Sequence, residues 1–186
     1  CSFTDPYQEE DLFVQVRYSL ALASLLGAPA FAAGLNVSIE VPRLDVAEYH
    51  RPYVAAWVER PDQSVAGTLA VWYDVKNKGN AEGEGTKWLK DMRQWWRRIG
   101  RELQMPVDGV SGATRPAGKH QIQVTEGSVQ LPKLAPGAYK LYVEAAREVG
   151  GREIVSIPFQ WPPAKTEQAN AAGSSELGEV RLELKP

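Results

Sequence analysis

Residues 108–114, with the sequence D-G-V-S-G-A-T, form the segment best suited to carry chemistry. Its two glycines and one alanine add little side-chain bulk, so another molecule can approach the Ser111 and Thr114 hydroxyls closely. A hydroxyl on an accessible loop is a possible site of covalent modification. The same residue types also form ordinary tight turns between strands, and on composition alone the turn is the favoured interpretation.

The run also resembles a known motif, D-x-x-[ST]-G-A-[TS], which bacterial flavin transferases recognise. Such motifs occur in the FMN-binding subunits of sodium-pumping quinone reductase and related electron-transport complexes. The matching residues are Asp108, Ser111, Gly112, Ala113 and Thr114. The resemblance implies that Thr114 carries FMN through a phosphoester and that Asp108 helps the transferase to recognise the segment. Without a flavin, Asp108 would only cap the turn, and Ser111 has the same two interpretations.

A wider resemblance covers nearly the whole chain after residue 33. It rests on V-P-R-L-D at 41–45, Y-H-R-P-Y at 49–53, K-W-L at 87–89, W-W-R-R at 95–98 and V-E-A-A-R-E at 143–148. With the 108–114 motif, these stretches resemble a predicted periplasmic bacterial family known only as domain of unknown function 2271. The resemblance implies a periplasmic location and association with a flavin transferase and a membrane electron-transfer protein.

An isoalloxazine ring needs a flat aromatic surface and nearby charge to tune its reduction potential. Candidates for the surface are Trp88, Trp95 and Trp96, and candidates for the charge are Arg97, Arg98 and Arg115. Tryptophans at helical spacing usually belong to a core, however, and a row of arginines is usually a solvated face. We therefore rank these residues below the motif.

Metal chemistry has little support in the sequence. His50 and His120 are the only histidines, and they could bind a metal or haem together only if folding brought them close. The single cysteine, Cys1, allows no internal disulfide, and no Cys/His spacing fits a structural zinc site. We predict no metal site.

The N-terminal region predicts export. Residues 17–32 contain an uncharged, alanine-rich apolar run that ends in A-F-A at 30–32, as in a signal peptide cleaved before Ala33. Four acidic residues within 1–16 do not suit the basic segment that precedes such a run. We interpret 1–16 as a doubtful N-terminal extension that reflects either a miscalled upstream start or a fragment, with true initiation near Val14 or Val16. We expect the mature protein in the periplasm.

The elements that must position the motif are mostly strands. Apolar and polar residues alternate or cluster in short runs at 35–41, 53–59, 68–74, 119–125, 138–146, 153–161 and 179–184. Pro136-Gly137 introduces one of these strands, and Gly150-Gly151 predicts a hairpin between two others. We expect one domain over 33–186, an immunoglobulin-like antiparallel β-sandwich.

One amphipathic helix is predicted within that domain, at about 86–99. Its apolar residues, including Met92 and Ile99, recur at helical spacing, with Thr86 as N-cap and Gly100 at the C-terminal end. The stretches 76–85 and 162–178 are expected to be loops.

Composition narrows the functional classes. The 44% hydrophobic and 24% charged residues are typical of a globular domain, and the net charge of −2 argues against nucleic-acid binding. The leading hypothesis is an exported electron carrier with FMN on Thr114, rather than a stand-alone enzyme. The alternative is a flavin-free periplasmic ligand-binding or assembly module with an immunoglobulin-like fold. A hydrolase is disfavoured because Ser111 and Thr114 lack a recognisable triad.

Overall fold

The computed structural model describes residues 32–75 and 85–186. These described residues belong to one compact unit. The predicted N-terminal extension lies outside the described residues, as does the predicted signal peptide apart from Ala32. No helix among the described residues is long and apolar enough to cross a membrane.

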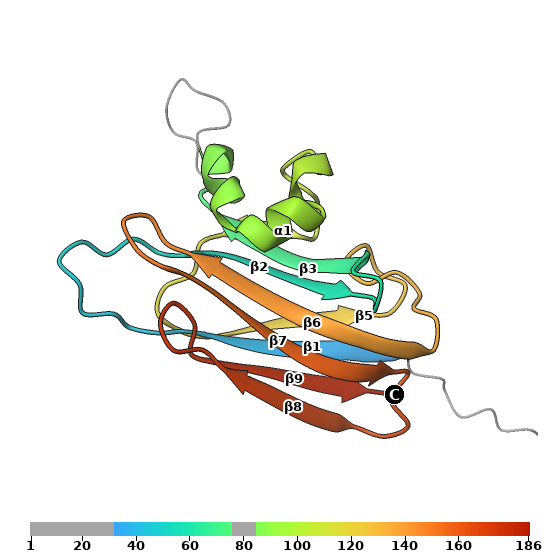
Figure 1. The fold of residues 1–186 in the computed structure, drawn as a ribbon. Helices are drawn as coiled ribbons and strands as arrows, with labels where there is room; N and C mark the ends of the chain where they lie inside the picture. Colours follow the sequence, from blue (N-terminus) through green and yellow to red (C-terminus); the bar gives the residue numbers. More distant parts are fainter. Residues whose placement is uncertain (1–31, 76–84) are drawn as a thin grey trace, which may run out of the picture. The chain divides into compact units, whose positions relative to one another are not determined.

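The strands form two sheets (Figure 1). In spatial order, the five-stranded sheet contains β4 (Ser111–Ala113), β3 (Val65–Tyr73), β2 (Tyr53–Glu59), β6 (Gly137–Ala146) and β7 (Arg152–Trp161). The four-stranded sheet contains, also in spatial order, β5 (Gly118–Thr125), β1 (Gly34–Val41), β9 (Glu179–Lys185) and β8 (Glu167–Ala172). Every neighbouring pair is antiparallel except β3 and β4, which run parallel.

The inner faces of the two sheets share one hydrophobic core. Alternate residues of β1, Leu35, Val37 and Ile39, meet Val54 and Leu141 of the larger sheet in this core. Burial on one face explains the strict alternation of β1, since successive side chains of a strand point to opposite faces. The structure thus confirms a mainly β fold of two sheets. The strand orders do not establish immunoglobulin-like connectivity.

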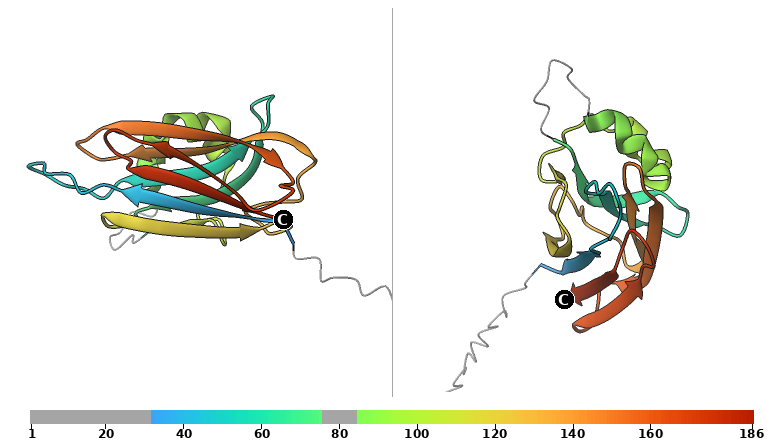
Figure 2. Two further views of the ribbon diagram at one scale, coloured as in Figure 1. Left: turned by 90° about the horizontal axis from the view of Figure 1, so that it is seen from below. Right: turned by 90° about the vertical axis from the view of Figure 1, so that its left-hand side faces the viewer.

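Part of the outer face of the larger sheet is also buried, beneath a layer of short helices (Figures 1 and 2). The layer comprises η1 (Gly85–Asp91), α1 (Arg93–Arg98) and η2 (Gly100–Glu102). Its Leu89, Met92 and Trp95 pack against Trp57 of β2 and Val71 of β3. Because β2, β3 and the second half of β6 are covered on both faces, these stretches are buried almost continuously rather than at alternate positions.

Two buried glutamates connect the larger sheet to this helical layer. Glu144 of β6 is fully buried and accepts hydrogen bonds from the Trp95 and Gln94 backbone N–H groups at 2.8 and 3.1 Å and from Arg152 Nε at 2.6 Å. Glu59 of β2 accepts from Trp57 Nε1 at 2.8 Å and from Arg98 Nε at 3.1 Å. A carboxylate therefore binds each end of α1.

This arrangement corrects the predicted helix over 86–99. The α-helix covers only Arg93–Arg98, and two 3₁₀ segments flank it. Thr86 does not cap it, because Glu144 on another element binds its first free N–H groups. Gly100 begins η2 rather than ending the helix, and a Cβ there would lie 2.7 Å from the Trp95 ring.

The seven predicted strands are all present, with boundaries within a few residues. The hairpin at Gly150-Gly151 is confirmed by hydrogen bonds from Gly150 N to Arg147 O and from Arg147 N to Gly151 O, both 3.0 Å. Two strands escaped prediction. β4 has only three residues, and β8 lies within the predicted loop 162–178, where its sequence E-Q-A-N-A-A has no strongly apolar face.

The connection between β8 and β9 folds around the Glu153 carboxylate. Its oxygens accept hydrogen bonds from the backbone N–H groups of Ser174, Ser175 and Leu177 at 2.6 to 3.0 Å, and from both serine hydroxyls. Burial favours the neutral acid, but these hydrogen bonds outweigh it and lower the pKa of Glu153 to about 2.

We predict that Glu144→Ala strongly destabilises the protein. The substitution leaves Arg152 and two N–H groups at the start of α1 without their buried acceptor, and loss of one partner of such a network costs about 3 to 5 kcal/mol. The free energy of unfolding in urea measures the effect. Glu167→Ala, on an exposed position of β8, is the control and should change it by less than about 0.5 kcal/mol.

We also predict that Glu153 stabilises the fold far into the acid range. Because its folded-state pKa lies below the ordinary value of 4.5, its contribution is complete above pH 4.5 and is lost as the pH falls toward about 2. Urea unfolding between pH 2 and pH 6 should therefore show a smaller loss of stability in Glu153→Gln than in the wild type. Parallel pH profiles for the two proteins would contradict this assignment.

Candidate functional site

The 108–114 segment forms the free edge of the larger sheet. After the helical layer, the chain turns at residues 107–110 and then adds β4 alongside β3. Val71 N donates to Val110 O at 2.9 Å, and Thr114 N donates to Tyr73 O at 3.1 Å, so hydrogen bonds to β3 fix both ends of the segment. The motif is therefore a short edge strand rather than only a turn.

Two residues of the motif stabilise the turn before β4. The Ser111 hydroxyl accepts a hydrogen bond from Val107 N at 2.8 Å. Gly109 has φ +75°, a left-handed conformation that glycine adopts without steric cost, and its carbonyl accepts from Gln130 Nε2 at 2.6 Å. Asp108 is exposed at this turn, and no hydrogen bond to its carboxylate occurs among the described residues.

Thr114 is the first residue after β4 and is half-buried. Its backbone N–H is bound to β3, whereas its side-chain hydroxyl has no hydrogen-bond partner among the described residues. Ala113 and Arg115 on either side are exposed. Of the two hydroxyls in the motif, Ser111 is thus engaged in the turn and Thr114 is available.

Beside Thr114 lies a cluster formed by Trp72, Arg115 and His120. The Arg115 guanidinium lies over the Trp72 ring, 5.3 Å from its centroid, and the His120 ring meets the indole edge-on at 5.8 Å. His120 Nε2 lies 2.8 Å from Pro116 O, so this nitrogen carries the proton when the ring is neutral. The cluster closes the edge where the chain passes from β4 in one sheet to β5 in the other.

Gly112 allows this cluster to pack. A Cβ at residue 112 would lie 3.3 Å from Trp72 Cδ1 and 3.9 Å from Arg115 Nη2. The lack of a side chain thus lets the β4 backbone approach the indole. Trp72 itself is only 4% exposed, so with Arg115 in place it offers no open face to a ligand. The outward surface beside Thr114 is the guanidinium.

The tryptophans predicted as a flavin surface lie in the helical layer instead. Trp95 is fully buried against β2 and β3, so it cannot stack on a ligand, and that prediction is wrong. Trp96 is half-buried against Trp95, while Trp88 is 40% exposed beneath the Lys87 ammonium. Arg97 is exposed, and Arg98 is bound to the buried Glu59.

The two histidines have separate partners. His50 Nε2 lies 2.8 Å from Glu48 and its Nδ1 lies 3.7 Å from Glu148, whereas His120 belongs to the cluster beside Thr114. Across residues 32–75 and 85–186, no group of three or more histidine, cysteine, aspartate or glutamate side chains is placed to hold a metal ion.

Trp72 and His120 are the site residues that sequence reasoning missed. Trp72 stands in an apolar strand, where a tryptophan predicts core, and His120 was weighed only as a metal ligand. Their proximity to Arg115 depends on the parallel pairing of β3 with β4, which no local pattern indicates.

Comparison with known protein families identifies the family of this chain. The model of the predicted periplasmic protein family DUF2271 matches residues 34–179. The chain belongs to this family. Its location is accordingly the periplasm, and the family description gives no activity. Neither the curated proteins nor the solved structures contain a match.

We predict a measurable coupling between Arg115 and Trp72. A double-mutant cycle with Arg115→Ala and Trp72→Leu, followed by urea unfolding, should give an interaction energy of about 0.5 to 1 kcal/mol, as expected for an exposed cation over an indole. The matched cycle pairs Trp72→Leu with Arg181→Ala, an exposed arginine of β9. Equal coupling in the two cycles would contradict the stacked geometry.

Proposed function

We propose that this DUF2271 protein is a periplasmic electron carrier with FMN covalently attached to Thr114. The observation that carries the proposal is the Thr114 hydroxyl. Thr114 is the last residue of a full match to the flavin-transferase motif and comes directly after an edge strand, and its hydroxyl has no hydrogen-bond partner among the described residues.

Attachment requires the transferase to reach that hydroxyl. An edge strand presents backbone groups that another protein can pair with, and β4 has a sheet neighbour on one side only. Gly112 and Ala113 add little bulk to the approach. Because β4 pairs with β3 through only three residues, local separation of this strand would break few hydrogen bonds.

The bond itself is a phosphoester, and its formation in water needs an activated phosphate donor. A flavin dinucleotide supplies one through its pyrophosphate. The Thr114 oxygen bonds to the FMN phosphorus, the pyrophosphate bond breaks with release of AMP, and the hydroxyl proton passes to a base of the transferase. The protein then retains the flavin without a tight non-covalent site, because tethering replaces free diffusion by a high local concentration.

Residues beside Thr114 supply positive charge and a planar surface for the attached FMN. The ester keeps one negative phosphate charge, and the Arg115 guanidinium is adjacent in sequence and exposed. The Arg115 guanidinium lies over the Trp72 ring, and its planar group offers a cationic surface for an isoalloxazine ring. The flavin supplies reversible electron transfer, and positive charge at this position favours its reduced, anionic form.

A second candidate is a flavin-free periplasmic ligand-binding or assembly module with an immunoglobulin-like topology. It is supported by the structural use of the motif, since the Ser111 hydroxyl and the Gly109 carbonyl both stabilise the turn before β4. In that case 108–114 would serve only to build the edge of the sheet.

Co-production with a flavin transferase separates the two candidates. We predict yellow protein that stays yellow after denaturation, with FMN located on the Thr114 peptide by mass spectrometry. Thr114→Val should abolish attachment, because it keeps the side-chain shape but removes the nucleophile, whereas Thr114→Ser should retain it. If the Thr114 peptide stays unmodified under conditions that modify a control substrate, the flavin proposal is contradicted and the flavin-free module becomes the favoured function.

A further inference from the structure

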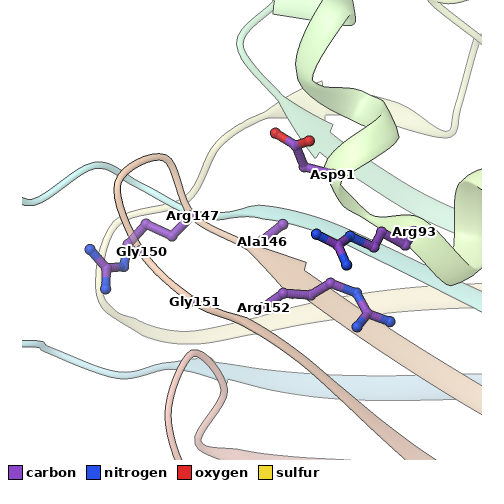
Figure 3. Close-up of a pocket in the computed structure, with 7 residues that line it drawn as sticks. All are labelled: Asp91, Arg93, Ala146, Arg147, Gly150, Gly151 and Arg152. Atoms are coloured by element: carbon purple, nitrogen blue, oxygen red, sulfur yellow. The ribbon is translucent and has the colours of Figure 1, made fainter.

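A second site, remote in sequence from Thr114, lies where the helical layer meets the β6–β7 hairpin. A cavity of about 320 Å³ opens there (Figure 3). It is lined by Asp91, Arg93, Ala146, Arg147, Gly150, Gly151 and Arg152. Three arginines and one acidic residue line it, and buried glutamates pair with two of the arginines, Arg147 and Arg152.

Two of these arginines, Arg93 and Arg152, have N–H groups that make no hydrogen bond among the described residues. Arg152 uses Nε to bind the buried Glu144, which holds its guanidinium in place and leaves its terminal nitrogens outside that bond. Arg93 is exposed and has no ion pair or hydrogen bond among the described residues. In Figure 3 the Arg93 side chain extends from α1 and the Arg152 side chain extends in the opposite direction from β7, below it in this view.

The remaining charged residues of the cavity leave this pair available. Arg147 is directed the other way in Figure 3 and forms a two-pronged ion pair with Glu176, at 2.8 and 3.0 Å. The Asp91 carboxylate also points away from both guanidinium groups, and it forms no ion pair with either. An anion entering the cavity thus meets the unpaired Arg93 guanidinium and the terminal nitrogens of Arg152, whose Nε is bound to Glu144.

The floor of the cavity is kept free of side chains. A Cβ at Gly150 would collide with the Arg147 guanidinium, and one at Gly151 would lie 2.8 Å from Glu176 Oε1. The Arg147–Glu176 pair beneath the hairpin therefore requires glycine at both positions.

Charge in the helical layer adds to the attraction. Residues 85–102 contain six cationic and two acidic residues, whereas the whole chain has a net charge of −2. The exposed cations of this layer are Lys87, Lys90, Arg93, Arg97 and Arg101. Clustered charge of one sign raises the local concentration of anions and focuses them into a neighbouring cavity.

We propose that this cavity binds a phosphate group between Arg93 and Arg152. One guanidinium fork satisfies the two oxygens of a carboxylate, whereas two forks from different elements suit the three or more oxygens of a phosphate. The phosphate belongs either to a soluble compound or to a lipid headgroup. The site does not depend on flavin at Thr114.

Calorimetric titration with inorganic phosphate tests the site, using periplasmic protein produced without a flavin transferase at low, constant ionic strength. We expect saturable binding to one site. Arg93→Gln should weaken it by about 10-fold or more, since a charge-assisted hydrogen-bonding pair is lost. The matched control is Arg97→Gln, an exposed arginine of the same helix outside the cavity, which should change affinity by less than about twofold.

Vesicles identify the source of the phosphate. Phosphatidylglycerol vesicles that bind the wild type but not Arg93→Gln, and that inorganic phosphate displaces, would assign a lipid headgroup. Phosphate binding without vesicle binding would assign a soluble compound. The proposal is overturned if phosphate binding does not saturate. It is also overturned if Arg93→Gln and Arg97→Gln weaken binding equally, because the cations of the helical layer would then attract phosphate without forming a specific site.

Discussion

The outer face of the five-stranded sheet is apolar, and the need to cover it determines most of what is distinctive in this structure. Trp57 and Val71 project from that face, so the chain after β3 must cross it before returning to the sheet. Glu144 and Glu59 bind the crossing segment at the two ends of α1. A crossing of this kind brings the chain back parallel to the strand it left, and β4 is that returning strand.

Both proposed sites result from this crossing. At its end, β4 carries the Thr114 hydroxyl along the free edge of the sheet, and Arg115 follows over Trp72. At its middle, the start of α1 brings Arg93 opposite Arg152 of β7, whose guanidinium is held by the same glutamate that binds the helix. Covering the apolar face thus positions the charged and hydroxyl side chains.

Much of the fold could be predicted because its strands have strong local signals. Alternation in β1 and apolar runs in β2, β3 and β6 report burial on one or two faces, and glycine pairs mark the turns. The short strands β4 and β8 lack such signals. The helix was predicted too long because apolar spacing cannot distinguish one α-helix from α and 3₁₀ segments bound to a buried carboxylate on another element.

The sequence predicted only the part of the candidate site that belongs to the 108–114 motif and its immediate neighbours. Thr114 and its neighbours could be found from the sequence, whereas Trp72 and His120 join them through a pairing of strands that no local pattern indicates. For Trp95 the sequence signal was ambiguous, because its helical spacing is compatible with either a core position or a flavin surface. The structure places Trp95 in the core.

The small size of β4 makes chemistry and folding separable in this protein. The Thr114 side chain makes no hydrogen bond within the described residues, and its strand meets the sheet through only three paired residues. Descendants of such a gene could lose or regain the hydroxyl by single codon changes while the scaffold stays intact. Members of one lineage could therefore share this architecture and differ in whether they present a hydroxyl at this position.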